Sequence, residues 1–142
     1  MTRPDSDANN GPALAAAAHP GKGHRGLARI VRAAGHSASG LRSAWRDESA
    51  FRQEACLAVA MCPAAFWLGR DWLEVSLLIA GVVLVLVVEL LNSAVEAAID
   101  RIGPEYHELS GKAKDCGSAA VMLSLLLAGA VWLAALWQRF GA

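Results

Sequence analysis

Long apolar stretches dominate the chain after residue 54 and are interrupted by very few charged side chains. Between Glu54 and Val88 there are only four charges, and between Ala119 and Gln138 there are none. A soluble domain of this length cannot hide such runs in its own interior, so the pattern predicts helices that lie in a bilayer.

Three membrane spans are expected, at about residues 52–68, 73–99 and 119–138. The apolar part of the first span is short and contains Pro63. The second is expected to continue as a helix to its polar end, and a polar connection, Arg101–Ser118, leads to the third. The pattern therefore predicts an all-α membrane protein.

A different pattern precedes the spans. Residues 1–24 have no periodic apolar face and are expected to form a disordered tail. From about 27 to 50, apolar residues recur at spacings of three, four or seven with arginines among them, which predicts a basic amphipathic helix on the membrane surface. Gly35 and Gly40 weaken this helix and leave open a break into two shorter ones. A soluble helix packed on a core is the alternative, but no soluble core follows.

Charge sets the expected orientation. Eight of the 13 Lys and Arg residues precede residue 55 and three lie in the connection between the second and third spans. By the positive-inside rule, the N-terminus and this connection face the cytoplasm in a multi-pass protein. The chain has equal numbers of acidic and basic residues, which gives no support to nucleic-acid binding. The three cysteines lack the spacing of a zinc site.

Polar residues on the second span are the first candidate site. Glu89, Asn92, Ser93, Glu96 and Asp100 fall on one face at about 100° per residue. Carboxylates near the bilayer are costly and normally face protein, a cation or water, so this face suggests a site. A helix that emerges into the cytoplasm with a solvated face is the alternative.

The second candidate is the charged stretch before the third span. Residues 105–120 contain three acidic side chains, two lysines and a histidine, a set that can contact phosphate and metal. An ordinary charged loop would look the same.

Three stretches closely resemble the small integral-membrane diacylglycerol kinases of bacteria: ARIVRAAGHSASGLRSAWRDESAFRQE, VELLNSAVEAAIDRIG and EYHELSGKAKDCGSAA. The resemblance extends from Leu27 to Gly141 and leaves out only the tail. It implies a membrane-embedded domain over residues 25–142 that forms a homotrimeric helical bundle in the inner membrane, with composite sites between subunits. It also implies Mg²⁺- and ATP-dependent phosphorylation of diacylglycerol to phosphatidic acid at the cytoplasmic face.

The resemblance also implies roles for individual residues. Glu89 matches the general base, Glu48 and Glu96 match the metal ligands, and Asn92 and Asp100 complete the polar face. The expected ATP contacts are the two metal ligands together with Arg29, His36, Glu105, Tyr106, His107, Lys114 and Asp115. The expected lipid contacts are Glu89 together with Arg29, Ala33, Ala34, Gly35, His36, Ser37, Ala38, Arg42, Ser43, Ala44, Trp45, Ala50, Phe51, Arg52, Gln53, Glu54, Trp67, Val75, Ser118, Trp132, Leu133, Ala134, Ala135, Leu136 and Trp137.

Two other functions stay open. An undecaprenol kinase would share the architecture, the motifs and the mechanism. No residue pattern in the chain indicates which lipid tail is bound. A non-enzymatic ion-path subunit could use Glu89 and Glu96 as a relay, but this leaves Glu48 and the Lys114–Asp115 pair without a role.

Overall fold

A computed structural model describes residues 26–103 and 105–141, and every regular element in these residues is a helix. The four helices are α1 (Leu27–Asp47), α2 (Ser49–Leu68), α3 (Trp72–Asp100) and α4 (Glu108–Phe140). The predicted all-α class is confirmed. The expected tail, residues 1–24, lies outside the described residues.

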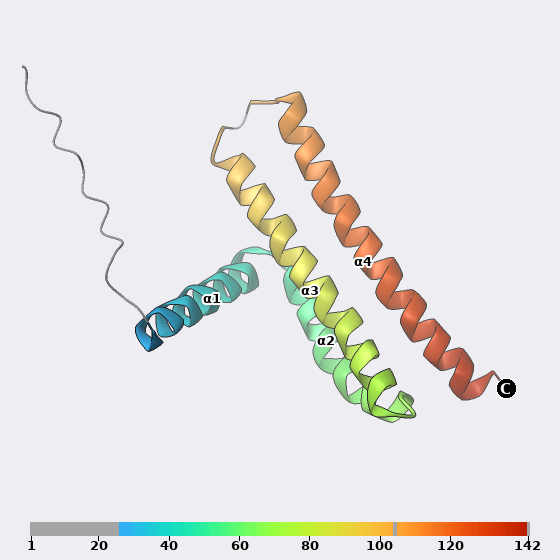
Figure 1. Cartoon of the computed structure of the whole chain (residues 1–142). Coiled ribbons are helices and arrows are strands. Elements are labelled where there is room, and N and C mark those ends of the chain that lie inside the picture. The colour runs from blue at the N-terminus through green and yellow to red at the C-terminus, as the bar shows by residue number, and fades with distance from the viewer. Residues whose placement is uncertain (1–25, 104, 142) are drawn as a thin grey trace, which may run out of the picture.

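Helices α2, α3 and α4 lie side by side with alternating directions (Figure 1). Their common core is a small cluster of Ala65, Leu68, Leu78 and Ala135, one end of which is next to the α2–α3 turn. Small residues allow α3 and α4 to approach closely, because a Cβ atom on Gly81 would lie 3.5 Å from the Cα of Ala128. The bundle is thin, and most large apolar side chains on it remain exposed.

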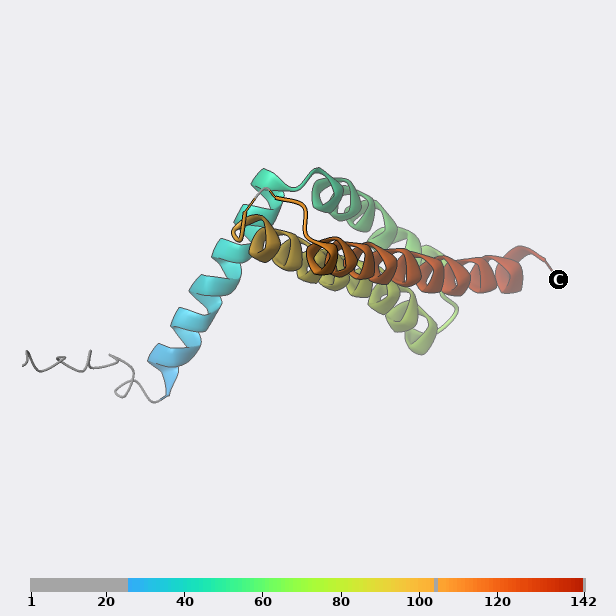
Figure 2. The same ribbon diagram turned by 90° about the horizontal axis from the view of Figure 1, so that it is seen from above.

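Helix α1 projects away from one end of this bundle (Figure 2). It contacts α2 and α3, and Ala44, near its C-terminal end, is its only buried residue. The helix runs without a break through Gly35 and Gly40, so the break that these glycines left open does not occur. The chain turns instead at Glu48, which has extended backbone angles (φ −106°, ψ 115°). Helix α1 thus ends at Asp47, three residues before the expected end near residue 50.

The last helix begins earlier than its apolar pattern indicated. The Nδ1 atom of His107 accepts a hydrogen bond from the backbone N–H of Leu109 (3.2 Å) and caps α4 there. The expected connection of residues 101–118 therefore shrinks to residues 101–107. As a result, Lys114 and Asp115 occupy defined positions on a helix rather than in a loop.

Two helices, α3 and α4, are long and apolar enough to cross a membrane. Only 28% and 17% of the residues in their most apolar windows are buried, so lipid or further protein must cover the remainder. Helix α2 has 20 residues with Pro63 inside. Its first turns are polar, so it is not apolar enough to count as a candidate membrane span. The third span thus stays a prediction.

The α2–α3 turn is held by side chains from both neighbours. Asp71 caps α3 by accepting a hydrogen bond from the backbone N–H of Glu74 (2.8 Å). The guanidinium of Arg70 pairs with Glu74 (3.2 Å) and also donates to Gln138 near the end of α4. Trp132 donates to the backbone carbonyl of Leu78 (3.3 Å). These contacts fix the end of the bundle opposite to α1.

Candidate active site

A groove of about 640 Å³ separates α1 from the later turns of α3. Its floor on α3 has the spacing of one helix face, which is why Leu90, Ser93, Ala94 and Ala97 line it together. Its other wall is the second half of α1 and the residue after it: Ser37, Gly40, Leu41, Ser43, Ala44, Asp47 and Glu48. The groove is open and combines small, polar and acidic side chains.

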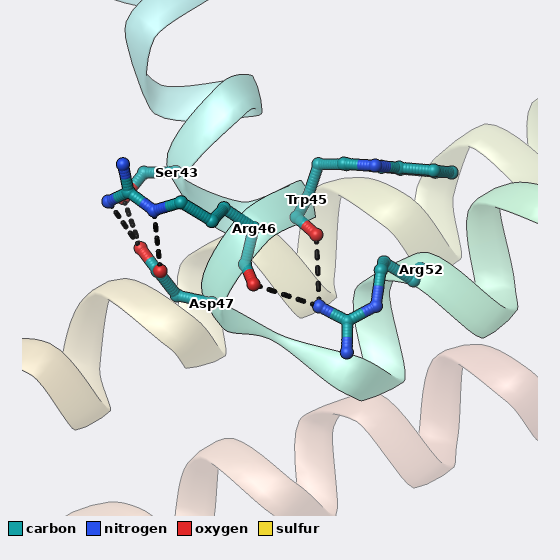
Figure 3. Close-up of polar contacts among 5 residues, drawn as sticks. All are labelled: Ser43, Trp45, Arg46, Asp47 and Arg52. Atoms are coloured by element: carbon teal, nitrogen blue, oxygen red, sulfur yellow. Dashed lines mark hydrogen bonds and ion pairs between the residues drawn. The ribbon is translucent and has the colours of Figure 1, made fainter.

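Glu48 occupies the corner between α1 and α2, and side chains on both sides stabilise that corner (Figure 3). The guanidinium of Arg52 donates to the backbone carbonyls of Trp45 and Arg46, at 3.0 Å each. These carbonyls end α1 and have no partner within the helix. The backbone N–H of Glu48 closes the last turn by donating to Ala44 (2.9 Å). The corner therefore presents the half-buried Glu48 side chain in a defined place.

A second acidic group lies beside Glu48 in the groove. Asp47 accepts hydrogen bonds from the guanidinium of Arg46 (2.8 and 3.0 Å) and from the hydroxyl of Ser43 (3.0 Å), as Figure 3 shows. The bonds from Arg46, and then that from Ser43, lower the pKa of the Asp47 carboxyl below its ordinary value. Asp47 is thus ionised at neutral pH, and its charge is already partnered within α1.

Several carboxylates gather where α2 and α3 meet the corner. Glu89 is 4% exposed, the most buried acidic residue in the described chain. Glu96 follows about two turns later on α3, and Glu48 of the corner and Glu54 of α2 are the other carboxyl groups in its neighbourhood. One of the two carboxylate oxygens of Glu54, Oε2, is buried without a hydrogen-bond partner. Neighbouring carboxylates in a poorly solvated place are unfavourable in their charged form unless a cation or a proton neutralises them.

Asn92 links this group to α4. Its amide Nδ2 donates to Oε1 of Glu96 (3.0 Å), while its Oδ1 is buried and has no hydrogen-bond partner. Close by, the ammonium of Lys114 pairs with Asp100 across the two helices (2.6 Å). The predicted polar face of the second span therefore faces α4 in part.

The available donors suit a hard cation. Among residues 26–103 and 105–141, no group of three or more His, Cys, Asp or Glu side chains is arranged to hold a metal ion. Magnesium, however, needs only one or two carboxylates when phosphate oxygens and water complete its shell. Glu48 and Glu96 offer carboxylate oxygens, the kind of ligand that Mg²⁺ prefers. This set fits Mg²⁺ bound together with a nucleotide.

The residues expected to contact ATP are not brought together within one chain. Helix α1 makes no contact with α4 in the described residues, so Arg29 and His36 do not meet Lys114. The three expected ATP contacts in the α3–α4 connection are exposed: Glu105, Tyr106 and His107. A single subunit thus offers separate fragments of the expected nucleotide site.

The expected lipid contacts divide into two groups. Ser37, Ser43 and Ala44 line the groove, and Phe51 is buried just beyond the corner. Trp67, Val75 and residues 132–137 lie toward the opposite end of the bundle, near the α2–α3 turn. Val75 and Glu89 are 14 residues apart on α3, which is about 21 Å along the helix axis.

Some groove residues were not expected. Leu90, Ala94, Ala97 and Leu41 line it, and so does Asp47. Leu90, Ala94 and Ala97 lie on the same face of α3 as Ser93, and this spacing is visible in the sequence. They were not predicted because small apolar side chains on an apolar helix do not by themselves indicate a binding site. Asp47 was not predicted because the resemblance to the kinase family pointed to its neighbour Glu48 as the functional carboxylate.

Comparison with known proteins decides the family. A family model described as prokaryotic diacylglycerol kinase matches residues 35–136. The chain belongs to that family. Among relatives of the prokaryotic diacylglycerol kinase family, the diacylglycerol kinase of Escherichia coli (strain K12) is 53% identical over 116 residues, 82% of this chain and 95% of the relative. Those of Haemophilus influenzae and Pseudomonas aeruginosa are 50% and 48% identical, over 75% and 80% of this chain and 91% and 92% of the relatives.

Membership in the prokaryotic diacylglycerol kinase family confirms the enzyme class expected from the three quoted stretches. The chain is a lipid kinase with membrane helices, of a bacterial, ATP-dependent family. An ion-path subunit would not explain this match, so that alternative loses its support. The matched range contains the corner, the groove and the acidic cluster described above.

Proposed function

We propose that this lipid kinase transfers the γ-phosphoryl group of ATP to the primary hydroxyl of diacylglycerol and forms phosphatidic acid at the cytoplasmic face of the inner membrane. The observation that carries the proposal is the family match, which spans both walls of the groove and the buried Glu89 next to it. In the proposed arrangement α2, α3 and α4 all cross the membrane, which would put the groove at one membrane surface and α1 along that surface.

Glu89 is the proposed general base. Its carboxylate takes the proton from the lipid hydroxyl as the hydroxyl oxygen forms a bond to the γ-phosphorus and the bond to ADP breaks. Its burial excludes water from the reacting proton, and its position one turn before Ser93 places it at the edge of the groove. No other acidic side chain on α3 is so deeply buried.

Glu48 and Glu96 are the proposed metal ligands. They come from different elements, the α1–α2 corner and α3, and they both approach Glu89. Mg²⁺ bound with ATP would neutralise the phosphate charges in the transition state. The same cation would offset the repulsion between neighbouring carboxylates. Lys114 is the proposed phosphate partner and would exchange Asp100 for the nucleotide.

The complete site is proposed to lie between subunits of a homotrimer. One chain leaves α1 and α4 apart and leaves the apolar sides of α3 and α4 uncovered. A neighbouring copy would bring the groove and Glu48 of one chain to Lys114 and Asp115 of another. It would also shield the polar face of α3 from lipid.

Phosphorylation of purified lipids tests the proposal. The protein is incubated in mixed micelles with radiolabelled ATP, Mg²⁺ and either diacylglycerol or undecaprenol, with a parallel sample in EDTA. Label in phosphatidic acid that depends on Mg²⁺ and exceeds label in undecaprenyl phosphate is expected. The reverse preference would reassign the lipid substrate, and no labelled lipid of either kind would overturn the kinase reaction itself.

A further inference from the structure

Gly117 of α4 lies directly against the side chain of Asn92 on α3. A Cβ atom built on Gly117 would overlap the Oδ1 atom of Asn92 and would lie only 3.3 Å from its Cγ atom. The amide of Asn92 therefore fills the space in which any other residue at position 117 would place its side chain. No other glycine of α3 or α4 meets a polar side chain at such close range.

The contact continues to the acidic cluster. With its Oδ1 against Gly117, Asn92 directs Nδ2 toward Glu96 and donates to Oε1 (3.0 Å). This hydrogen bond occupies one carboxylate oxygen and restricts the rotation of the Glu96 side chain. Partners of this kind orient metal ligands and commonly determine how well they bind.

We propose that Gly117 is a positioning residue: its missing side chain makes room for the Asn92 amide, which holds the Glu96 carboxylate in its metal-binding orientation. The inference rests on the proposed role of Glu96 as a ligand of the nucleotide-bound metal. It assigns a function to a glycine in the middle of a helix, where glycine is otherwise unfavourable.

Helix propensity separates this role from simple packing. In the interior of a helix, alanine is more favourable than glycine. The atom that must give way to an added methyl group is the far end of a rotatable amide rather than backbone. Gly117→Ala therefore turns Asn92 away from Glu96 without opening the α3–α4 interface. The expected defect lies in metal binding and leaves folding intact.

The test measures Mn²⁺ bound in the presence of a non-hydrolysable ATP analogue, by electron paramagnetic resonance on the full protein in micelles. Gly117→Ala is expected to weaken Mn²⁺ binding by about 10-fold, the lower end of the effect of removing an orienting partner. Gly81→Ala is the matched control, because it adds the same methyl group at the same helix pair with only ordinary contact to Ala128. The control should bind Mn²⁺ as the unchanged protein does.

A double-mutant cycle tests whether Gly117 acts on metal binding through Asn92. Asn92→Ala alone should weaken Mn²⁺ binding to a similar extent, and adding Gly117→Ala to it should have no further effect, because the overlapping amide is gone. Independent, additive losses would overturn the inference, and so would unchanged Mn²⁺ binding in Gly117→Ala. Melting temperatures of all variants are compared, and a Gly117→Ala protein that melts well below the Gly81→Ala protein would indicate a packing role instead. If the unchanged protein binds no Mn²⁺ with the analogue, the proposed metal site fails first.

Discussion

Replacing Glu89 with glutamine is expected to lower turnover strongly and to leave the stability of the fold equal or higher. The amide keeps the size and shape of the side chain but cannot accept a proton. Because general-base catalysis typically contributes about 10²–10⁴-fold, Glu89→Gln should lower the turnover of diacylglycerol by at least about 100-fold. ATP-analogue binding should persist, since Glu48 and Glu96 are unchanged.

The same change should not destabilise the fold. Glu89 and Glu96 are seven residues apart on α3, about 10 Å along the axis. Two ionised groups at that distance repel by about 1.7 kcal/mol at an effective dielectric constant near 20. Glu48 adds further repulsion on the buried Glu89 carboxylate. Removing the charge at position 89 relieves this repulsion, so the free energy of unfolding should stay equal or rise.

A coupled assay of ADP release in mixed micelles measures turnover, and denaturation in the same micelles measures stability. Glu74→Gln is the matched control, a glutamate on the same helix at the opposite end, paired with Arg70. It should leave turnover unchanged. A Glu89→Gln protein that keeps more than a tenth of the normal turnover would remove Glu89 from the role of base. One that unfolds more easily than the unchanged protein would refute the repulsion argument.

Three further outcomes are expected. Glu48→Gln and Glu96→Gln should each raise the Mg²⁺ concentration needed for half-maximal turnover, because each withdraws a charged oxygen ligand; a normal Mg²⁺ titration would exclude that residue as a ligand. Deletion of residues 1–24 should leave turnover unchanged, and a large loss would reveal an element missed in the sequence. Refolding inactive Glu89→Gln chains together with inactive Lys114→Ala chains should restore some turnover, as should Glu48→Gln with Glu96→Gln. Mixed oligomers proven by cross-linking but inactive in both pairs would place each site within one chain.

Much of the fold was visible in the sequence because the apolar runs are long and their ends are polar. The boundaries of α3 agree with the expected second span to within a residue at each end. The start of α4 was missed because residues 108–118 are polar. Their helix is set by the His107 cap and by contacts such as Lys114 with Asp100, neither of which hydropathy records.

The candidate site could be predicted only in part. Glu89 and Glu96 stood out in the sequence because they are charged residues on an apolar helix, and their catalytic roles stay predictions. The groove could not be foreseen, because it depends on where α1 turns. That turn is determined by the extended backbone of Glu48 and the carbonyl contacts of Arg52, which are tertiary details. Gly117 was invisible for the same reason, since its significance lies in a neighbour on another helix.

Helix α1 has its one buried residue, Ala44, near its C-terminal end, so a rigid tilt of this helix would turn about Glu48. Arg29 lies 19 residues before Glu48 and therefore about 28 Å from it. A tilt of about 10° would displace Arg29 by about 5 Å and leave Glu48 almost where it was. A change in the membrane surface that alters this tilt should therefore move Arg29 and its neighbours, whereas the Glu48 carboxylate should stay almost in place. The enzyme's response to its lipid surroundings should then appear in the substrate concentration required rather than in the rate of the chemical step.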